Sequence, residues 1–100
     1  MNQEIATSTL LFVDDDANVL SALRRLFSSL GYRVLTAETG AGGLALMEAE
    51  RVDLVISDMR MPEMTGAEEL EQIRLKWPDV VRILLTGYDD LEATVNAINR

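Results

Sequence analysis

VDLVISDMRMPEMTG, residues Val52 to Gly66, is the stretch that decides the fold. It contains an apolar run, Leu54 to Ile56, without polar alternation, which is typical of a parallel strand buried on both faces. Asp58 follows this run, and the next loop contains a proline and a glycine. In open α/β sheets, ligands bind beside the carboxyl ends of the strands. We therefore expect Asp58 to face a crevice at one sheet edge; the alternative is that it only caps a turn.

The rest of the chain alternates strand and helix patterns. Apolar runs predict three more strands, and a 3.6-residue apolar period or local capping signals predict four helices. The strands are expected at Leu10–Val13, Arg33–Ala37 and Val80–Leu85, the last of them buried. The helices are expected at Ala17–Leu30, Ala41–Arg51, from Thr65 to Trp77 before Pro78, and from Leu91 to the end. Such βα units in series predict one parallel sheet with helices on both faces, the doubly wound α/β class.

Side chains near the helix starts have specific expected roles. Asp16 is placed to cap the first helix, and Thr65 with Glu68 has the Thr-x-x-Glu spacing of a capping box. Leu70, Ile73 and Trp77 are expected to point inward from that helix. We expect Glu68, Glu69 and Glu71 to form only its solvated face.

Acidic residues follow two of the predicted strands. Asp14 and Asp15 follow the first, Asp58 ends the third, and Thr86 follows the fourth. The carboxyl ends of parallel strands lie at one sheet edge, so these residues are expected there together. Clustered carboxylates repel one another unless a cation is present, and a set without His or Cys selects a hard ion such as Mg²⁺. Phosphoryl transfer to an aspartate is chemistry that such a site supports.

Composition excludes several function classes. The chain has 100 residues, enough for one small domain, and 48% of them are hydrophobic, which favours a folded globule. It has no histidine or cysteine, so imidazole catalysis, disulfides and thiolate zinc sites are excluded. The net charge of −8 opposes binding to nucleic acid. No apolar run reaches the length of a membrane span, and a cytoplasmic location is expected by default.

Three motifs resemble those of response regulator receiver domains of two-component signalling. They are VDDDANVL (Val13–Leu20), SDMRMPEMTG (Ser57–Gly66) and LLTGYDD (Leu84–Asp90), in the order and spacing of that family. The resemblance covers residues 9–100, after a tail of residues 1–8. It implies a flavodoxin-like sheet of strand order 2-1-3-4.

The resemblance also implies roles for single residues. Asp58 would accept a phosphoryl group from the phosphohistidine of a sensor kinase or phosphotransfer protein, and the domain would switch an output domain of the full-length protein rather than act as an enzyme. Thr86 would contact the phosphoryl group. The Mg²⁺ ligands would be Asp14, Asp15, Asp58 and the main-chain carbonyl of Arg60. Arg60 and Tyr88 either tune the lifetime of the phosphoryl group or are merely solvated.

Family members continue through a fifth strand and a fifth helix, whereas this sequence ends at Arg100. We therefore expect residues 9–100 to be an incomplete receiver domain, without the lysine and the aromatic switch residue of the fifth strand. An uncovered strand at Val80–Leu85 would then favour self-association or exchange of elements between copies.

Two other function classes stay open. One is an interaction or dimerisation module that works unphosphorylated. The other is a phosphohydrolase with an aspartyl nucleophile, of the haloacid-dehalogenase type. Asp14-x-Asp16 has the spacing of those enzymes, but Asn18 stands where their threonine belongs.

Overall fold

The computed structural model describes residues 7–86, which form a parallel four-stranded sheet with three helices. In chain order the elements are β1 (Thr9–Val13), α1 (Ala17–Ser29), β2 (Arg33–Ala37), α2 (Gly40–Ala49), β3 (Leu54–Asp58), α3 (Gly66–Lys76) and β4 (Val81–Leu85). The strand order β2-β1-β3-β4 confirms the predicted doubly wound sheet. The predicted helix from Leu91, Tyr88 and most of the tail lie outside the described residues.

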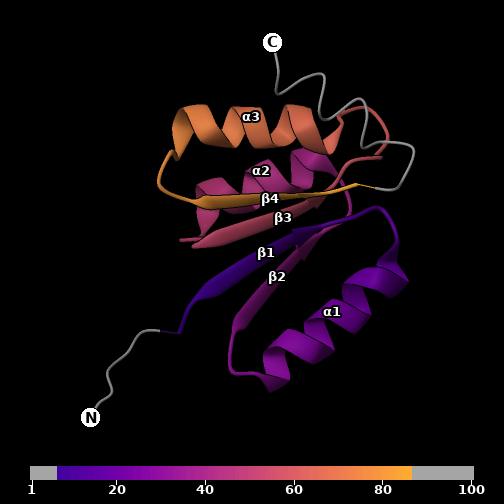
Figure 1. The fold of residues 1–100 in the computed structure, drawn as a ribbon, viewed down its shortest axis with the longest axis vertical. Coiled ribbons are helices and arrows are strands. Elements are labelled where there is room, and N and C mark those ends of the chain that lie inside the picture. The colour runs from indigo at the N-terminus through magenta and orange to yellow at the C-terminus, as the bar shows by residue number, and fades with distance from the viewer. Residues whose placement is uncertain (1–6, 87–100) are drawn as a thin grey trace.

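The helices form two layers around the sheet: α1 covers one face, and α2 and α3 cover the other (Figure 1). Each layer has its own apolar core. The core under α2 and α3 contains Leu11, Val13, Ala37, Met47, Val52, Val55, Met61 and Ile73. The core under α1 contains Leu10, Phe12, Leu20 and Val34.

Burial differs between the central and outer strands. β1 pairs with β2 and β3 and is buried along its whole length, whereas β3 is fully buried on one face and half-buried on the other. The prediction of a buried fourth strand, made from its apolar run, is wrong, whereas the expectation of an uncovered strand at Val80–Leu85 agrees with the described residues. Val81, Ile83 and Leu85 of β4 are 54%, 39% and 46% exposed, because no described strand pairs with its outer edge and no described helix covers that face.

The helix starts follow the capping signals. The Asp16 carboxylate accepts a hydrogen bond from the main-chain N–H of Asn18 at 2.9 Å, which confirms it as the N-cap of α1. Thr65 and Glu68 form both hydrogen bonds of a capping box at the start of α3. α2 starts one residue earlier than predicted, because Thr39 caps its first turn through the N–H of Gly42. It ends two residues earlier than predicted, at Ala49, because Glu50 is in an extended conformation.

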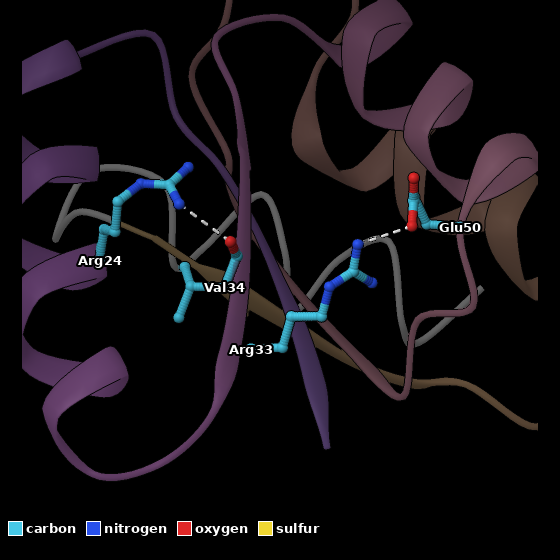
Figure 2. A network of polar contacts seen from close by, with 4 residues as sticks. All are labelled: Arg24, Arg33, Val34 and Glu50. Atoms are coloured by element: carbon cyan, nitrogen blue, oxygen red, sulfur yellow. Dashed lines mark hydrogen bonds and ion pairs between the residues drawn. The ribbon is translucent and has the colours of Figure 1, made fainter. Parts of the chain in front are cut away.

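Two arginine side chains form polar contacts at the outer strand β2, one reaching it from α1 and the other extending from it toward the end of α2 (Figure 2). The Arg24 guanidinium on α1 donates to the carbonyl oxygen of Val34 at 3.0 Å. Arg33 on β2 forms an ion pair with Glu50 at the end of α2, at 2.8 Å. A hydrogen bond to an outer-strand carbonyl removes one acceptor that a foreign strand would use, so Arg24 protects this sheet edge.

None of the helices within residues 7–86 is both long and apolar enough to cross a membrane.

Candidate functional site

The carboxyl end of β1 supplies two of the predicted acids. The N–H of Asp14 donates to the carbonyl of Ala37 at 3.1 Å, which extends the pairing of β1 with β2 by one residue. The Asp14 carboxylate accepts from the main-chain N–H of Asp16 at 2.8 Å. The chain turns here into α1, so Asp14 is half-buried and Asp15 is exposed. Asp16 is engaged as the helix cap and is separate from the cluster of the other acids.

The carboxyl end of β3 supplies Asp58. In the sheet register Asp58 lies opposite Leu85, and the N–H of Met59 donates to the Leu85 carbonyl at 2.9 Å. The half-buried Thr86 follows Leu85 directly, so the sheet holds it at the same edge as Asp58.

Three carboxylates converge at this edge, as the sequence predicts. One ligand oxygen from each of Asp14, Asp15 and Asp58 lies within 4.8 Å of the other two. Among the described residues this is the group of acids that could hold a metal ion. Because all three donors are carboxylate oxygens and one is exposed to solvent, the set suits a hard divalent cation that keeps part of its water shell.

The loop between β3 and α3 forms a groove beside these acids. Its lining residues are Asp15, Met59, Arg60, Met61, Pro62 and Thr65. Met61 is buried in the core under α2 and α3, where it fills space between the helices and the sheet, while Arg60 is exposed. Glu63 has a φ of 71°, a left-handed conformation that is uncommon for a residue other than glycine.

Glycine is required at position 66, where the loop enters α3. A Cβ atom there would lie 2.2 Å from the carbonyl oxygen of Asp58 and 2.8 Å from a methyl group of Leu84. The N–H of Gly66 also donates to the Met59 carbonyl at 3.0 Å. The start of α3 therefore packs directly on the backbone of Asp58.

The prediction that Glu69 lies on the solvated face of α3 is wrong. Its side chain is fully buried, and one carboxylate oxygen accepts a hydrogen bond from the hydroxyl of Ser57 at 2.8 Å. Burial raises the pKa of Glu69 to about 7, although the Ser57 hydrogen bond opposes this shift. The sequence held one signal for this position: Glu69 precedes the inward Ile73 by four residues and so shares its helix face. Ser57, beside Asp58, was not predicted as a site residue either.

Comparison with known families supports the resemblance that the three sequence motifs indicate. A family model described as the response regulator receiver domain matches residues 10–100. The transcriptional regulatory protein GlrR of Escherichia coli (strain K12) is 44% identical over 88 residues, which are 88% of this chain and 20% of that protein. The chain thus spans about a fifth of the length of the curated relatives it matches.

Solved structures show the same fold. The signal receiver domain of an HD domain-containing protein from Pseudomonas fluorescens Pf-5 matches with a TM-score of 0.86 and 37% identity, over 94% of this chain and 75% of that one. The response regulator protein TrrA from Thermotoga maritima, in complex with Mg²⁺-BeF, matches with a TM-score of 0.83 and 34% identity, over 92% of this chain and 80% of that one.

Proposed function

The chain belongs to the response regulator receiver domain family, and we propose that Asp58 is its phosphoacceptor. The observation that carries this proposal is the convergence of Asp14, Asp15 and Asp58, whose ligand oxygens lie within 4.8 Å of one another. Asp58 is the acid on β3, between the two acids that follow β1 and the Thr86 that follows β4. Receiver domains are signalling modules, so the expected consequence of phosphorylation is a switch in a partner or an output domain.

In the proposed reaction a carboxylate oxygen of Asp58 attacks the phosphorus of a phosphohistidine. The new P–O bond forms as the P–N bond breaks, and the imidazole leaves with the electron pair and takes up a proton. Asp14 and Asp15, with Asp58 and the main-chain carbonyl of Arg60, are the proposed ligands of Mg²⁺. When bound, that ion neutralises charge on the carboxylates and on the transferred phosphoryl group. The Thr86 hydroxyl is the proposed hydrogen-bond donor to a phosphoryl oxygen.

The proposed partners follow from this chemistry. A sensor histidine kinase or a phosphotransfer protein would supply the phosphoryl group, and an output domain of a longer protein would respond to it, in the cytoplasm. A second copy of this chain is a further proposed partner, through the exposed apolar side chains of β4.

The test is the intact mass of the chain after incubation with Mg²⁺ and a small phosphodonor such as acetyl phosphate. We expect one added phosphoryl group, which Asp58→Asn and an excess of EDTA should each abolish. Glu71→Gln, which changes an exposed acid on α3, should be labelled like the wild type. Labelling that survives in Asp58→Asn, or its absence from the wild type, would overturn the proposal. Repeated turnover of a phosphomonoester would instead indicate a phosphohydrolase.

A further inference from the structure

A buried carboxyl group, that of Glu69 on α3, lies under the proposed phosphoacceptor. Glu69 is 0% exposed. Its Oε1 atom accepts the hydrogen bond from Ser57, at 2.8 Å, while its Oε2 atom is buried and has no hydrogen-bond partner within the described part of the chain. A buried carboxyl group that is only half satisfied is costly, so its role needs an explanation.

The nearest neighbours of this carboxyl group are uncharged. A Cβ atom on Gly43 of α2 would lie 2.2 Å from Oε2 and 2.9 Å from a methyl group of Val13, so α2 lies close against this oxygen and Val13 of β1 lies nearby. Gly43, Val13 and Ser57, which face it, do not titrate.

The ionisable groups of the surrounding elements have other positions or partners. Asp14 follows Val13, and Asp58 follows Ser57, both in the site already described. Glu48 of α2 pairs with Lys76, and Arg82 of β4 donates to the carbonyls of Pro78 and Val80. On α3 itself, Glu68 forms the capping box and Glu71 pairs with Arg74.

The Ser57 hydroxyl has one proton and two acceptors within reach. The acceptors are Oε1 of Glu69 at 2.8 Å and the main-chain carbonyl oxygen of Asp58 at 3.2 Å. When Glu69 is ionised, the hydroxyl donates to its carboxylate, because a charged acceptor makes the stronger hydrogen bond. When Glu69 is protonated, the acid can donate to the hydroxyl oxygen, and the hydroxyl proton is then available to the Asp58 carbonyl.

We propose that Glu69 is a positioning residue for Asp58. Glu69 acts through the Ser57 hydroxyl, and the protonation state of Glu69 decides whether that hydroxyl donates a hydrogen bond to the main-chain carbonyl of Asp58. This inference rests on the proposed role of Asp58 as phosphoacceptor. The protonated form adds a hydrogen bond to the peptide group of the acceptor, on the same carbonyl that Gly66 packs against. The reaction of Asp58 is therefore coupled to a proton held under α3.

The raised pKa of Glu69 means that this coupling operates near neutral pH. Burial raises its pKa from 4.5 to about 7, against the lowering effect of the Ser57 hydrogen bond. Both protonation states are therefore populated around pH 7.

The direct test is an NMR titration of the uniformly ¹³C,¹⁵N-labelled chain between pH 5.5 and 8.5. The side-chain carboxyl carbon of Glu69 should titrate near pH 7, and the main-chain carbonyl carbon of Asp58, read through the N–H of Met59, should follow with the same midpoint. In Ser57→Ala the Glu69 carbon should still titrate while the Asp58 carbonyl no longer follows it. In Glu69→Gln the change in the Asp58 carbonyl signal near pH 7 should be absent. An Asp58 carbonyl that is flat through the titration of Glu69, or that still follows it in Ser57→Ala, would overturn the proposal.

The functional test compares the rates of phosphorylation of wild type and Glu69→Gln by the same phosphodonor at each pH. Since both proteins meet the same donor, the ratio of the wild-type rate to the variant rate removes the pH dependence of the donor. The amide introduced by Glu69→Gln resembles the neutral acid, so the ratio should be near one at pH 6. The ratio should fall roughly two- to tenfold by pH 8, where ionised Glu69 of the wild type withdraws the Ser57 hydrogen bond from the Asp58 carbonyl. This range corresponds to the free energy of one net hydrogen bond. Ile73→Val, a packing change on the same helix face, should give a ratio independent of pH.

The two proposals fail in different ways. If the wild type is not phosphorylated at all, the role of Asp58 fails, whatever the titration shows. If it is phosphorylated but the ratio of rates to Glu69→Gln is the same at every pH, only the role of Glu69 fails.

Discussion

Glu69 makes the stability of the fold depend on pH in a definite direction. Its pKa is about 7 in the folded chain against 4.5 as the ordinary value, so the folded state binds more protons between these two pH values. The free energy of unfolding should therefore fall as the pH rises from about 4.5 to about 7, and stay level above that range. A shift of this size corresponds to an upper limit on the order of 3 kcal/mol.

Urea denaturation of wild type and Glu69→Gln at several pH values measures this effect. We expect the wild type to lose about 2 to 3 kcal/mol relative to the variant between pH 4.5 and pH 7.5. Glu71→Gln changes an exposed acid of the same helix and should not remove that loss. Equal pH dependence in wild type and Glu69→Gln would show that the Glu69 carboxyl is not perturbed in the fold.

Among the secondary-structure elements, the packing of α3 against β3 depends on the absence of a side chain at Gly66. In Gly66→Ala the new Cβ would meet the Asp58 carbonyl, which is part of the sheet and cannot move as a side chain can. Overpacking of this kind costs roughly 1 to 3 kcal/mol, and α3 must shift away from the acceptor strand.

Gly66→Ala should therefore lower both the urea midpoint and the rate of phosphorylation at Asp58. Leu75→Ala truncates a side chain that is 68% exposed on the same helix, and it should change stability by less than about 0.5 kcal/mol. A Gly66→Ala chain with wild-type stability and labelling rate would mean that this close approach is not needed.

The order of the elements and the acids of the site could be predicted because their signals are local. The apolar run before Asp58 and the capping box of Thr65 and Glu68 each depend on a few neighbouring residues. The strand order could not be worked out from those patterns, and the family resemblance provided it.

Features that depend on contacts between distant segments were mispredicted. The local pattern places Glu69 on the surface next to Glu68, whereas its burial depends on a glycine 26 positions earlier, Gly43, which leaves space for the carboxyl group. The apolar run of β4 predicts a buried strand, yet its burial depends on what lies beside it in the sheet. Neither the position of Gly43 beside Glu69 nor the neighbour of β4 in the sheet can be inferred from the local sequence.

At the scale of the whole molecule, an apolar surface on the α1 side of the sheet favours association. Leu10, Phe27, Leu54, Ile56, Val81 and Ile83 line a groove there. We expect the 100-residue chain to sediment as a mixture of monomer and larger species that shifts with concentration, and Ile83→Lys to shift it toward monomer. Leu75→Lys alters an exposed leucine outside this groove and should leave the mixture unchanged. A folded chain that is monomeric at every concentration would contradict this prediction.

The role of Asp58 is tested most directly by mapping which residue carries the phosphoryl group. Borohydride reduces an aspartyl phosphate to homoserine, so the phosphorylated chain can be reduced, digested and mapped by tandem mass spectrometry. We predict homoserine at position 58 and at no other acid, with Asp14 and Asp15 unchanged. Homoserine at another position, or none in a chain treated with phosphodonor and Mg²⁺, would contradict the assignment of Asp58 as the phosphoacceptor.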